Sequence, residues 1–148
     1  LVNAGCTALY TDSRLDGARR ALVSRLFDSV GRSYWLEHES QLDAVTAISG
    51  SGPAYYHLFS EALVQAGVLL GLTPELALDL ARQTAFGAAS QQVREDADIV
   101  DLRTAVTSPK GTTAAAIAVF EQDQALRRLI EAATQAAYRR SQELSTGR

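Results

Sequence analysis

The chain has 148 residues, of which 47% are hydrophobic and 21% charged, so it can bury a core and has the composition of an ordinary globular protein. Its formal charge of −3 gives no electrostatic reason to expect nucleic acid as a partner, and no apolar run has the length of a membrane span. One cysteine and 2 histidines exclude a disulfide framework and a cysteine-rich metal site. A lone cysteine fits a reducing compartment, so we expect a cytoplasmic protein.

The N-terminal part of the sequence has α/β character. Segment 1–10 is short, apolar and contains glycine, which is compatible with a strand or an extended loop. Apolar residues then recur at three- and four-residue steps, which predicts a helix with a cap at Asp12 or Ser13 and an end at Gly31. Residues 33–36 are typical of a short strand. Strand, helix and strand in this order indicate an α/β unit.

The sequence beyond this unit predicts only helices. Residues 49–52 alternate serine and glycine, which we interpret as a flexible loop, and Pro53 then fits the first turn of a helix that ends at Gly71. The run 73–75 contains a hydroxyl cap, a proline at the first helical position and an acid in the first turn. This stronger start signal predicts a helix that ends near Gln92.

The last part of the chain predicts three more helical segments. The first is short and ends at Val106. Residues 107–111 contain proline and glycine and break the pattern, so the next helix should begin at Thr112 or Thr113. Asp123 is the expected cap of the final helix.

Several of these helices are apolar on more than one face, as in residues 62–70. A helix that is apolar nearly all round must be buried on all sides, and a single copy of a small helical domain rarely has enough interior for that. We therefore expect a homodimer, which can assemble further into oligomers of dimers.

The stretch 106–117 places a loop directly before a helix, with hydroxyl side chains on both sides of the glycine. The free N–H groups and the positive dipole end of a helix start attract carboxylates and phosphates, and Gly111 would let a ligand approach the backbone. The competing interpretation makes Thr112 an ordinary N-cap and Gly111 a turn residue. Spacing alone favours this second interpretation, because caps vastly outnumber anion sites.

Three stretches of the chain, in the same order, resemble the pyrroline-5-carboxylate reductase family: Asp43–Tyr55, Ala81–Ala89 and Val106–Glu121. The resemblance covers essentially the whole chain. Residues 1–37 are similar to the last strand–helix–strand of the family's dinucleotide-binding Rossmann domain. Residues 38–148 are similar to its all-helical substrate-binding and dimerisation domain, a bundle like the C-terminal domain of 6-phosphogluconate dehydrogenase.

This resemblance implies a reaction and a site. The family reduces the C=N bond of Δ1-pyrroline-5-carboxylate with hydride from NADPH or NADH and forms L-proline, the last step of proline biosynthesis. The implied residues are Ser108, Gly111 and Thr112 for the substrate carboxylate, Thr113 as the catalytic contact to the ring nitrogen, and Val106 and Thr107 for the cofactor. No metal ion is implied. The implied anion site agrees with the one drawn from the helix start, and so reverses the preference for a simple cap at Thr112.

Two departures from the family pattern matter. Lys110 stands where the family usually has glycine, alanine or asparagine, so the side chain could assist the carboxylate or point to solvent, and a tight backbone conformation there is in question. No strand–Gly-x-Gly-x-x-Gly–helix unit is present, so the phosphate-binding half of the cofactor site is missing. We expect the C-terminal part of a reductase, inactive by itself. Two alternatives stay open: a related reductase of another imine or keto acid, and a non-catalytic dimerisation module.

Overall fold

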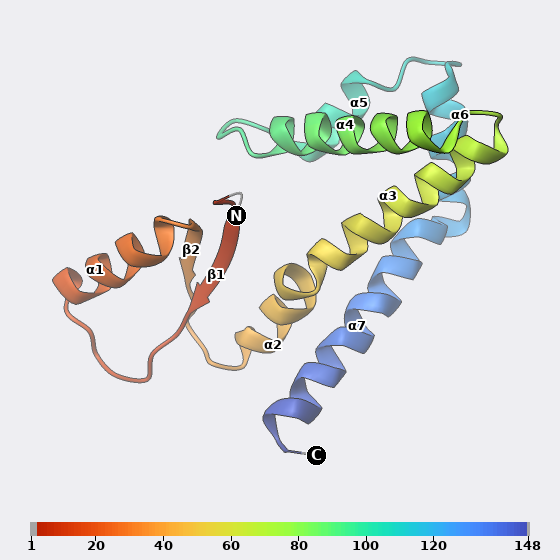
Figure 1. Ribbon diagram of the computed structural model, residues 1–148. Helices are drawn as coiled ribbons and strands as arrows, with labels where there is room; N and C mark the ends of the chain where they lie inside the picture. Colours follow the sequence, from red (N-terminus) through yellow and green to blue (C-terminus); the bar gives the residue numbers. More distant parts are fainter. Residues whose placement is uncertain (1–2, 148) are drawn as a thin grey trace. The chain divides into compact units, whose positions relative to one another are not determined.

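The computed structural model describes residues 3–147 (Figure 1). The chain is mainly helical, as expected, with one two-stranded sheet in the described part. It divides into two compact units, one formed by the chain up to Pro53 with the segment from Ala132 onward, the other by Ala54–Glu131. The division after residue 37 remains a prediction. None of the helices in the described range is long and apolar enough to cross a membrane.

The N-terminal segment forms the expected strand–helix–strand unit. Strands β1 (Gly5–Leu9) and β2 (Gly31–Trp35) pair in parallel, and helix α1 (Gly17–Asp28) connects them, as parallel strands require. Leu1 and Val2, included in the expected strand, lie outside the described residues. A Cβ atom on Gly31 would clash with the backbone of Gly5, so glycine lets the two strands meet at this end.

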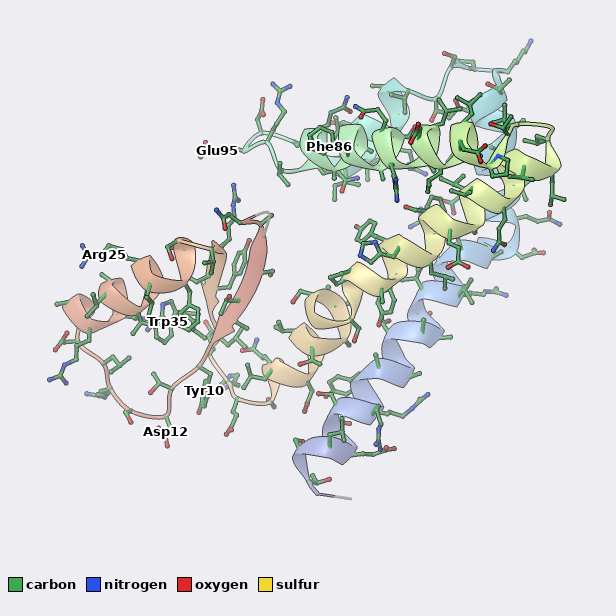
Figure 2. The ribbon with its side chains drawn as sticks, in the orientation of Figure 1. Tyr10, Asp12, Arg25, Trp35, Phe86 and Glu95 are labelled. Atoms are coloured by element: carbon green, nitrogen blue, oxygen red, sulfur yellow. The ribbon has the colours of Figure 1, made fainter. Side chains whose placement is uncertain are left out.

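Trp35 packs the sheet against α1 (Figure 2). Its indole Nε1 donates a hydrogen bond of 2.8 Å to the Ser24 hydroxyl, and the Arg20 guanidinium lies 4.4 Å from the centroid of its ring. Such a cation–π contact and a satisfied indole N–H fix the large side chain in one orientation.

The predicted ends of α1 are wrong. Asp16 caps the helix, its carboxylate accepting a hydrogen bond of 2.8 Å from the backbone N–H of Arg19. Asp12 and Ser13 are engaged in a local turn instead, where the Ser13 hydroxyl donates to the Asp12 carboxylate at 3.1 Å. The helix ends at Asp28, and Gly31 already belongs to β2.

The serine–glycine run predicted as a flexible loop is largely helical. Helix α2 (Gln41–Val45) passes into a π turn (Thr46–Gly50), and α3 (Gly52–Leu69) begins two residues later. The Ser49 hydroxyl donates to the Val45 carbonyl at 3.1 Å, so it supports the turn rather than opening it. The Ser141 hydroxyl on α7 (Ala125–Ser145) donates to the Asp43 carboxylate at 2.6 Å and ties α2 to the C-terminal helix.

Helices α3 and α4 (Pro74–Gln92) approach each other near the turn between them, and their ends lie near the predicted positions. Gly71 follows α3 with φ of 98°, a conformation that favours glycine at a helix end. The Thr73 hydroxyl accepts a hydrogen bond of 3.3 Å from the Leu76 N–H, which confirms the predicted cap. A Cβ atom on Gly67 would lie 3.1 Å from the Cβ of Ala77, so the two helices approach closely at this point.

Helices α5 (Ile99–Ala105), α6 (Thr112–Glu121) and α7 follow. The prediction that Asp123 caps the last helix is wrong. Asp123 lies inside a short 3-10 turn with φ of 50°, and α7 begins only at Ala125. The left-handed backbone at Asp123 makes a sharp corner between α6 and α7, which a capping geometry with extended backbone would not give.

Glu121 links three helices at the end of α6. Its carboxylate accepts hydrogen bonds of 2.8 and 2.7 Å from Arg127 on α7, and Arg103 on α5 lies 3.3 Å away. The hydrogen bond from Arg127 holds the pKa of Glu121 below its ordinary value of 4.5, against a smaller opposing effect of desolvation. Phe59 of α3 contacts Phe120 nearby, with ring centroids 6.4 Å apart.

The interior of this chain is small. Among residues 3–147 the buried hydrophobic residues are Ala47, Ala77 and Ala81, and no large side chain is fully buried. Large apolar side chains instead lie exposed along the helices, for example Leu58, Leu69, Leu70, Leu80, Phe86, Val119 and Leu129. Exposed apolar surface of this extent marks an interaction site.

The glycine contact between α3 and α4 gives a test of the packing. Gly67→Ala should destabilise the chain by about 1–3 kcal/mol, because the new methyl group overpacks against Ala77. Gly87→Ala is the matched control, since a Cβ there meets nothing within 4 Å and alanine favours a helix interior by about 0.5–1 kcal/mol. Urea denaturation should give opposite signs for the two variants; equal stabilisation would show that the close approach is wrong.

The ion pairs of Glu121 predict a dependence of stability on pH. A carboxyl group whose pKa is lowered by folding stabilises the fold above its unfolded pKa, and this contribution is lost as pH falls through the folded pKa. Glu121→Gln should therefore lower the melting temperature at pH 7, and its difference from the wild type should shrink as the pH falls well below 4.5.

Glu143→Gln is the control for that experiment. Glu143 accepts a hydrogen bond of 2.7 Å from Arg140 within the same helix. Removing this bond therefore breaks no contact between different helices. Its effect on the melting temperature should be smaller. A difference between Glu121→Gln and wild type that stays constant into strong acid would contradict the assignment.

Candidate functional site

The segment between α5 and α6 is firmly tied to the end of α5. The Thr107 backbone N–H donates to the Thr104 carbonyl at 3.0 Å, and its hydroxyl donates to the Arg103 carbonyl at 2.6 Å. The Thr107 hydroxyl proton is thus committed to the protein. Val106, immediately before it, remains 61% exposed and offers an apolar surface to a ligand.

A tight turn follows at residues 108–111. The Gly111 N–H donates to the Ser108 carbonyl at 3.0 Å, Pro109 is the second residue of the turn, and Lys110 is the third with φ of 61°. Proline followed by a residue with positive φ is the pattern of a type II turn. Lys110 thus adopts the left-handed conformation that its side chain had put in question, at a cost of roughly 1–2 kcal/mol relative to glycine.

Gly111 is needed for space rather than for its backbone angle. Its φ of −82° is open to any residue, but a Cβ atom there would lie 3.1 Å from the Ser108 carbonyl oxygen. Glycine therefore allows the turn to close tightly against the start of α6.

Helix α6 begins without a side-chain cap. Its N-cap residue is Gly111, which has no side chain to accept a hydrogen bond, and Thr112 is the first helical residue. The interpretation of Thr112 as the cap is therefore wrong, because the tight turn moves the cap position back to the glycine. Within residues 3–147 the cap of α6 makes no side-chain hydrogen bond to the first N–H groups, where the positive end of the helix dipole lies.

Thr113 lies in the first turn of α6 and is half-buried. Within residues 3–147 its hydroxyl has no hydrogen-bond partner, in contrast to Thr104 and Thr107, whose hydroxyls donate to carbonyls one turn back at 2.8 and 2.6 Å. The structure thus brings Ser108, Gly111, Thr112 and Thr113 together around one helix start, with a free hydroxyl among uncapped N–H groups.

Other parts of the chain offer less chemistry. No group of three metal-binding side chains occurs in the described range. His57 lies exposed on α3 and His38 in the linker before α2. The π turn at Thr46–Gly50 was missed by the sequence reasoning, although π turns are frequent at functional sites. Its only sequence signal was the serine–glycine alternation, which is equally typical of a loop.

A family model described as pyrroline-5-carboxylate reductase dimerisation matches residues 39–144. The chain belongs to this family. Its match includes α2, the turn at 108–111 and the start of α6.

Similar proteins carry the same name. The pyrroline-5-carboxylate reductase of Pseudomonas aeruginosa is 43% identical over 98% of this chain and 53% of its own length. That of Mycobacterium tuberculosis is 45% identical over 97% of this chain and 54% of its own length. The chain therefore spans about half the length of these curated relatives.

Solved structures agree with the fold. A pyrroline-5-carboxylate reductase from Coxiella burnetii has a TM-score of 0.91 at 42% identity, covering 97% of this chain and 53% of that protein. The Plasmodium falciparum pyrroline carboxylate reductase, solved with NADP bound, has a TM-score of 0.75 at 31% identity, covering 90% of this chain and 51% of that protein. At these identities the likeness extends to the residues as well as the fold.

Proposed function

We propose that this chain supplies the substrate-binding and dimerising half of a pyrroline-5-carboxylate reductase, which reduces Δ1-pyrroline-5-carboxylate to L-proline. The observation that carries the proposal is the start of α6, where the free, half-buried hydroxyl of Thr113 lies next to uncapped backbone N–H groups. The names of the relatives and of the matching family support it. We place the protein in the cytoplasm, because the free, exposed Cys6 suits a reducing compartment.

The substrate carboxylate binds at the turn and the first N–H groups of α6. Ser108 contributes its side-chain hydroxyl and Thr112 a backbone N–H group, while Gly111, whose own N–H is held by the Ser108 carbonyl, lets the carboxylate approach the backbone. A carboxylate is favoured here because the helix dipole and the unpaired donors both attract negative charge. It takes the place of the side-chain acceptor that the N-cap glycine lacks.

Thr113 positions the ring nitrogen. The reaction breaks the C=N π bond, places a hydride on the ring carbon and leaves the proton of the protonated imine on nitrogen. The Thr113 hydroxyl accepts a hydrogen bond from that N–H and so orients the ring. A protonated imine is already electrophilic, so orientation rather than acid–base chemistry is the main task of the side chains.

The residues of this chain fit only part of an NADP or NAD molecule. Val106 is exposed and can pack against the nicotinamide ring, whereas the Thr107 hydroxyl can only accept a hydrogen bond there because it already donates to Arg103. No glycine-rich phosphate cradle occurs in the 148 residues. When bound, the cofactor supplies the hydride; the residues of this chain hold the imine that receives it.

The dimer belongs to the same proposal. Helices α3 and α4 leave an apolar groove between them, lined mainly by Tyr56, Phe59, Leu63, Ala85 and Ala88. A second copy of the chain would cover this groove and the exposed leucines beside it, which the small interior cannot. Obligate interfaces between identical subunits are typically large and apolar in this way.

Light scattering at micromolar concentration should give twice the mass of the chain. Phe86 on α4 (Figure 2) is 68% exposed, and Phe86→Asp should shift the protein toward monomer because it places a charge in the apolar interface. Leu26→Asp is the matched control, since Leu26 is 67% exposed but lies on α1, outside the proposed interface. A stable, folded monomer of the wild type would overturn this part of the proposal.

The role of Thr113 is tested in an enzyme that carries these 148 residues behind the N-terminal half that the relatives possess, called the complete enzyme below. Thr113→Ala should lower kcat/KM for pyrroline-5-carboxylate about tenfold to a hundredfold, since a hydrogen bond to a charged group contributes about 1.5–3 kcal/mol. The affinity for NADPH should hardly change.

Thr112→Ala is the control for that variant. Thr112 is not the cap, and its proposed contact is made by the backbone N–H, so the variant should keep most of its activity and its stability. The assignment fails if Thr113→Ala retains normal kinetics, or if both variants lose activity only in proportion to lost folded protein.

A further inference from the structure

Lys110 is the only lysine of the chain. The sequence has 14 basic residues, and all the others are arginine. The single lysine lies in the turn at 108–111, directly before the helix start that forms the proposed substrate site. An ammonium group is a compact charge on a flexible stem, whereas arginine is a planar fork, so the two residues are not equivalent.

The backbone at Lys110 is unfavourable for a lysine. Its φ of 61° is left-handed, and the third position of a type II turn favours glycine or asparagine. A glycine would adopt this conformation without strain, yet the sequence has lysine here and its glycine at the next position, where space requires it. Stability alone therefore does not account for the side chain at this place.

Contacts within the protein do not explain the lysine at position 110 either. Its side chain is exposed, and the ion pairs of residues 3–147 are made by arginines alone. No carboxylate of the described range pairs with the ammonium group. Its charge is therefore free to act on a ligand at the adjacent site.

We propose that Lys110 determines the specificity of the site for substrates that carry a carboxylate, its ammonium group attracting the carboxylate of the cyclic imine. This inference rests on the proposed function. The backbone N–H groups of α6 hold the carboxylate at short range, while the ammonium group adds a full positive charge from the side of the turn. A protonated cyclic imine without a carboxylate is only repelled by that charge, so Lys110 favours the substrate that carries the carboxylate over the one that lacks it.

The test compares pyrroline-5-carboxylate with unsubstituted 1-pyrroline, which lacks the carboxylate, in the complete enzyme. Lys110→Gln removes the charge and keeps a long side chain in the same backbone conformation. It should raise KM for pyrroline-5-carboxylate about threefold to tenfold at low salt, and it should not lower kcat/KM for 1-pyrroline, whose protonated ring the ammonium group can only repel. Lys110→Arg, which keeps the charge, should stay close to wild type.

Salt and stability give two further readouts. Raising the salt concentration from about 50 mM to about 500 mM should bring the KM of the wild type toward that of Lys110→Gln, because screening removes the same attraction. Lys110→Gly should raise the melting temperature, since glycine relieves the left-handed backbone, and yet raise KM for pyrroline-5-carboxylate as Lys110→Gln does. A residue with a purely structural role cannot give this opposite pair of effects.

The outcomes separate this inference from the function on which it rests. A wild-type complete enzyme that does not reduce pyrroline-5-carboxylate overturns the proposed function. An active wild type whose Lys110→Gln and Lys110→Gly variants keep the same KM overturns the role of Lys110 alone. The role is equally overturned if both substrates lose efficiency together, or if Lys110→Arg is impaired as strongly as Lys110→Gln.

Discussion

The shortage of interior is the constraint on which the rest of this structure depends. Helices α3 and α4 carry apolar side chains on several faces, yet the buried hydrophobic residues in the described part of the chain are three alanines. Small residues such as Gly67 and Ala77 bring two helices close together but bury little apolar area. Most of the hydrophobic stabilisation must therefore come from contacts that one copy cannot make with itself. In such a fold, stability depends on association. The fraction of the chain that is folded is then nearly equal to the fraction that is assembled.

The helix that carries the proposed site is held at both ends. At its start the turn closed by Gly111 and Ser108 fixes the direction of entry. At its end Glu121 is bound by arginines from the helices before and after it. A ligand site that depends on the direction of a few N–H groups needs such support, because small errors in geometry cost much of the binding energy. The ion pairs around Glu121 hold the helix on which the proposed site lies, although they make no contact with that site.

The sequence predicted best the elements whose signals are local and redundant. Thr73, Pro74 and Glu75 each favour a helix start at the same place, and α4 begins there. The start of α1 had several possible caps within five residues, and the polar side chains nearest the predicted position were engaged in a turn. The serine–glycine run before α3 fits a loop or a π turn equally well by composition. The π turn is closed by the backbone hydrogen bond of 2.8 Å from the Ser51 N–H to the Thr46 carbonyl, and the Ser49 hydroxyl supports it by donating to Val45; composition predicts neither bond.

The sequence predicted the elements around the candidate site but not their geometry, and the roles of the site residues stay a prediction. The sequence placed the loop and the helix start correctly, and it left open whether Thr112 was a cap. The turn at 108–111 decides whether Thr112 is the cap, because Lys110 adopts a left-handed backbone conformation and Gly111 packs closely against Ser108. These two features move the cap position onto a residue without a side chain. The helix start is thus left without an acceptor of its own, and a carboxylate from outside the chain can complete it. Backbone conformation, rather than the chemistry of any single side chain, turns an ordinary helix start into one that can accept an anion.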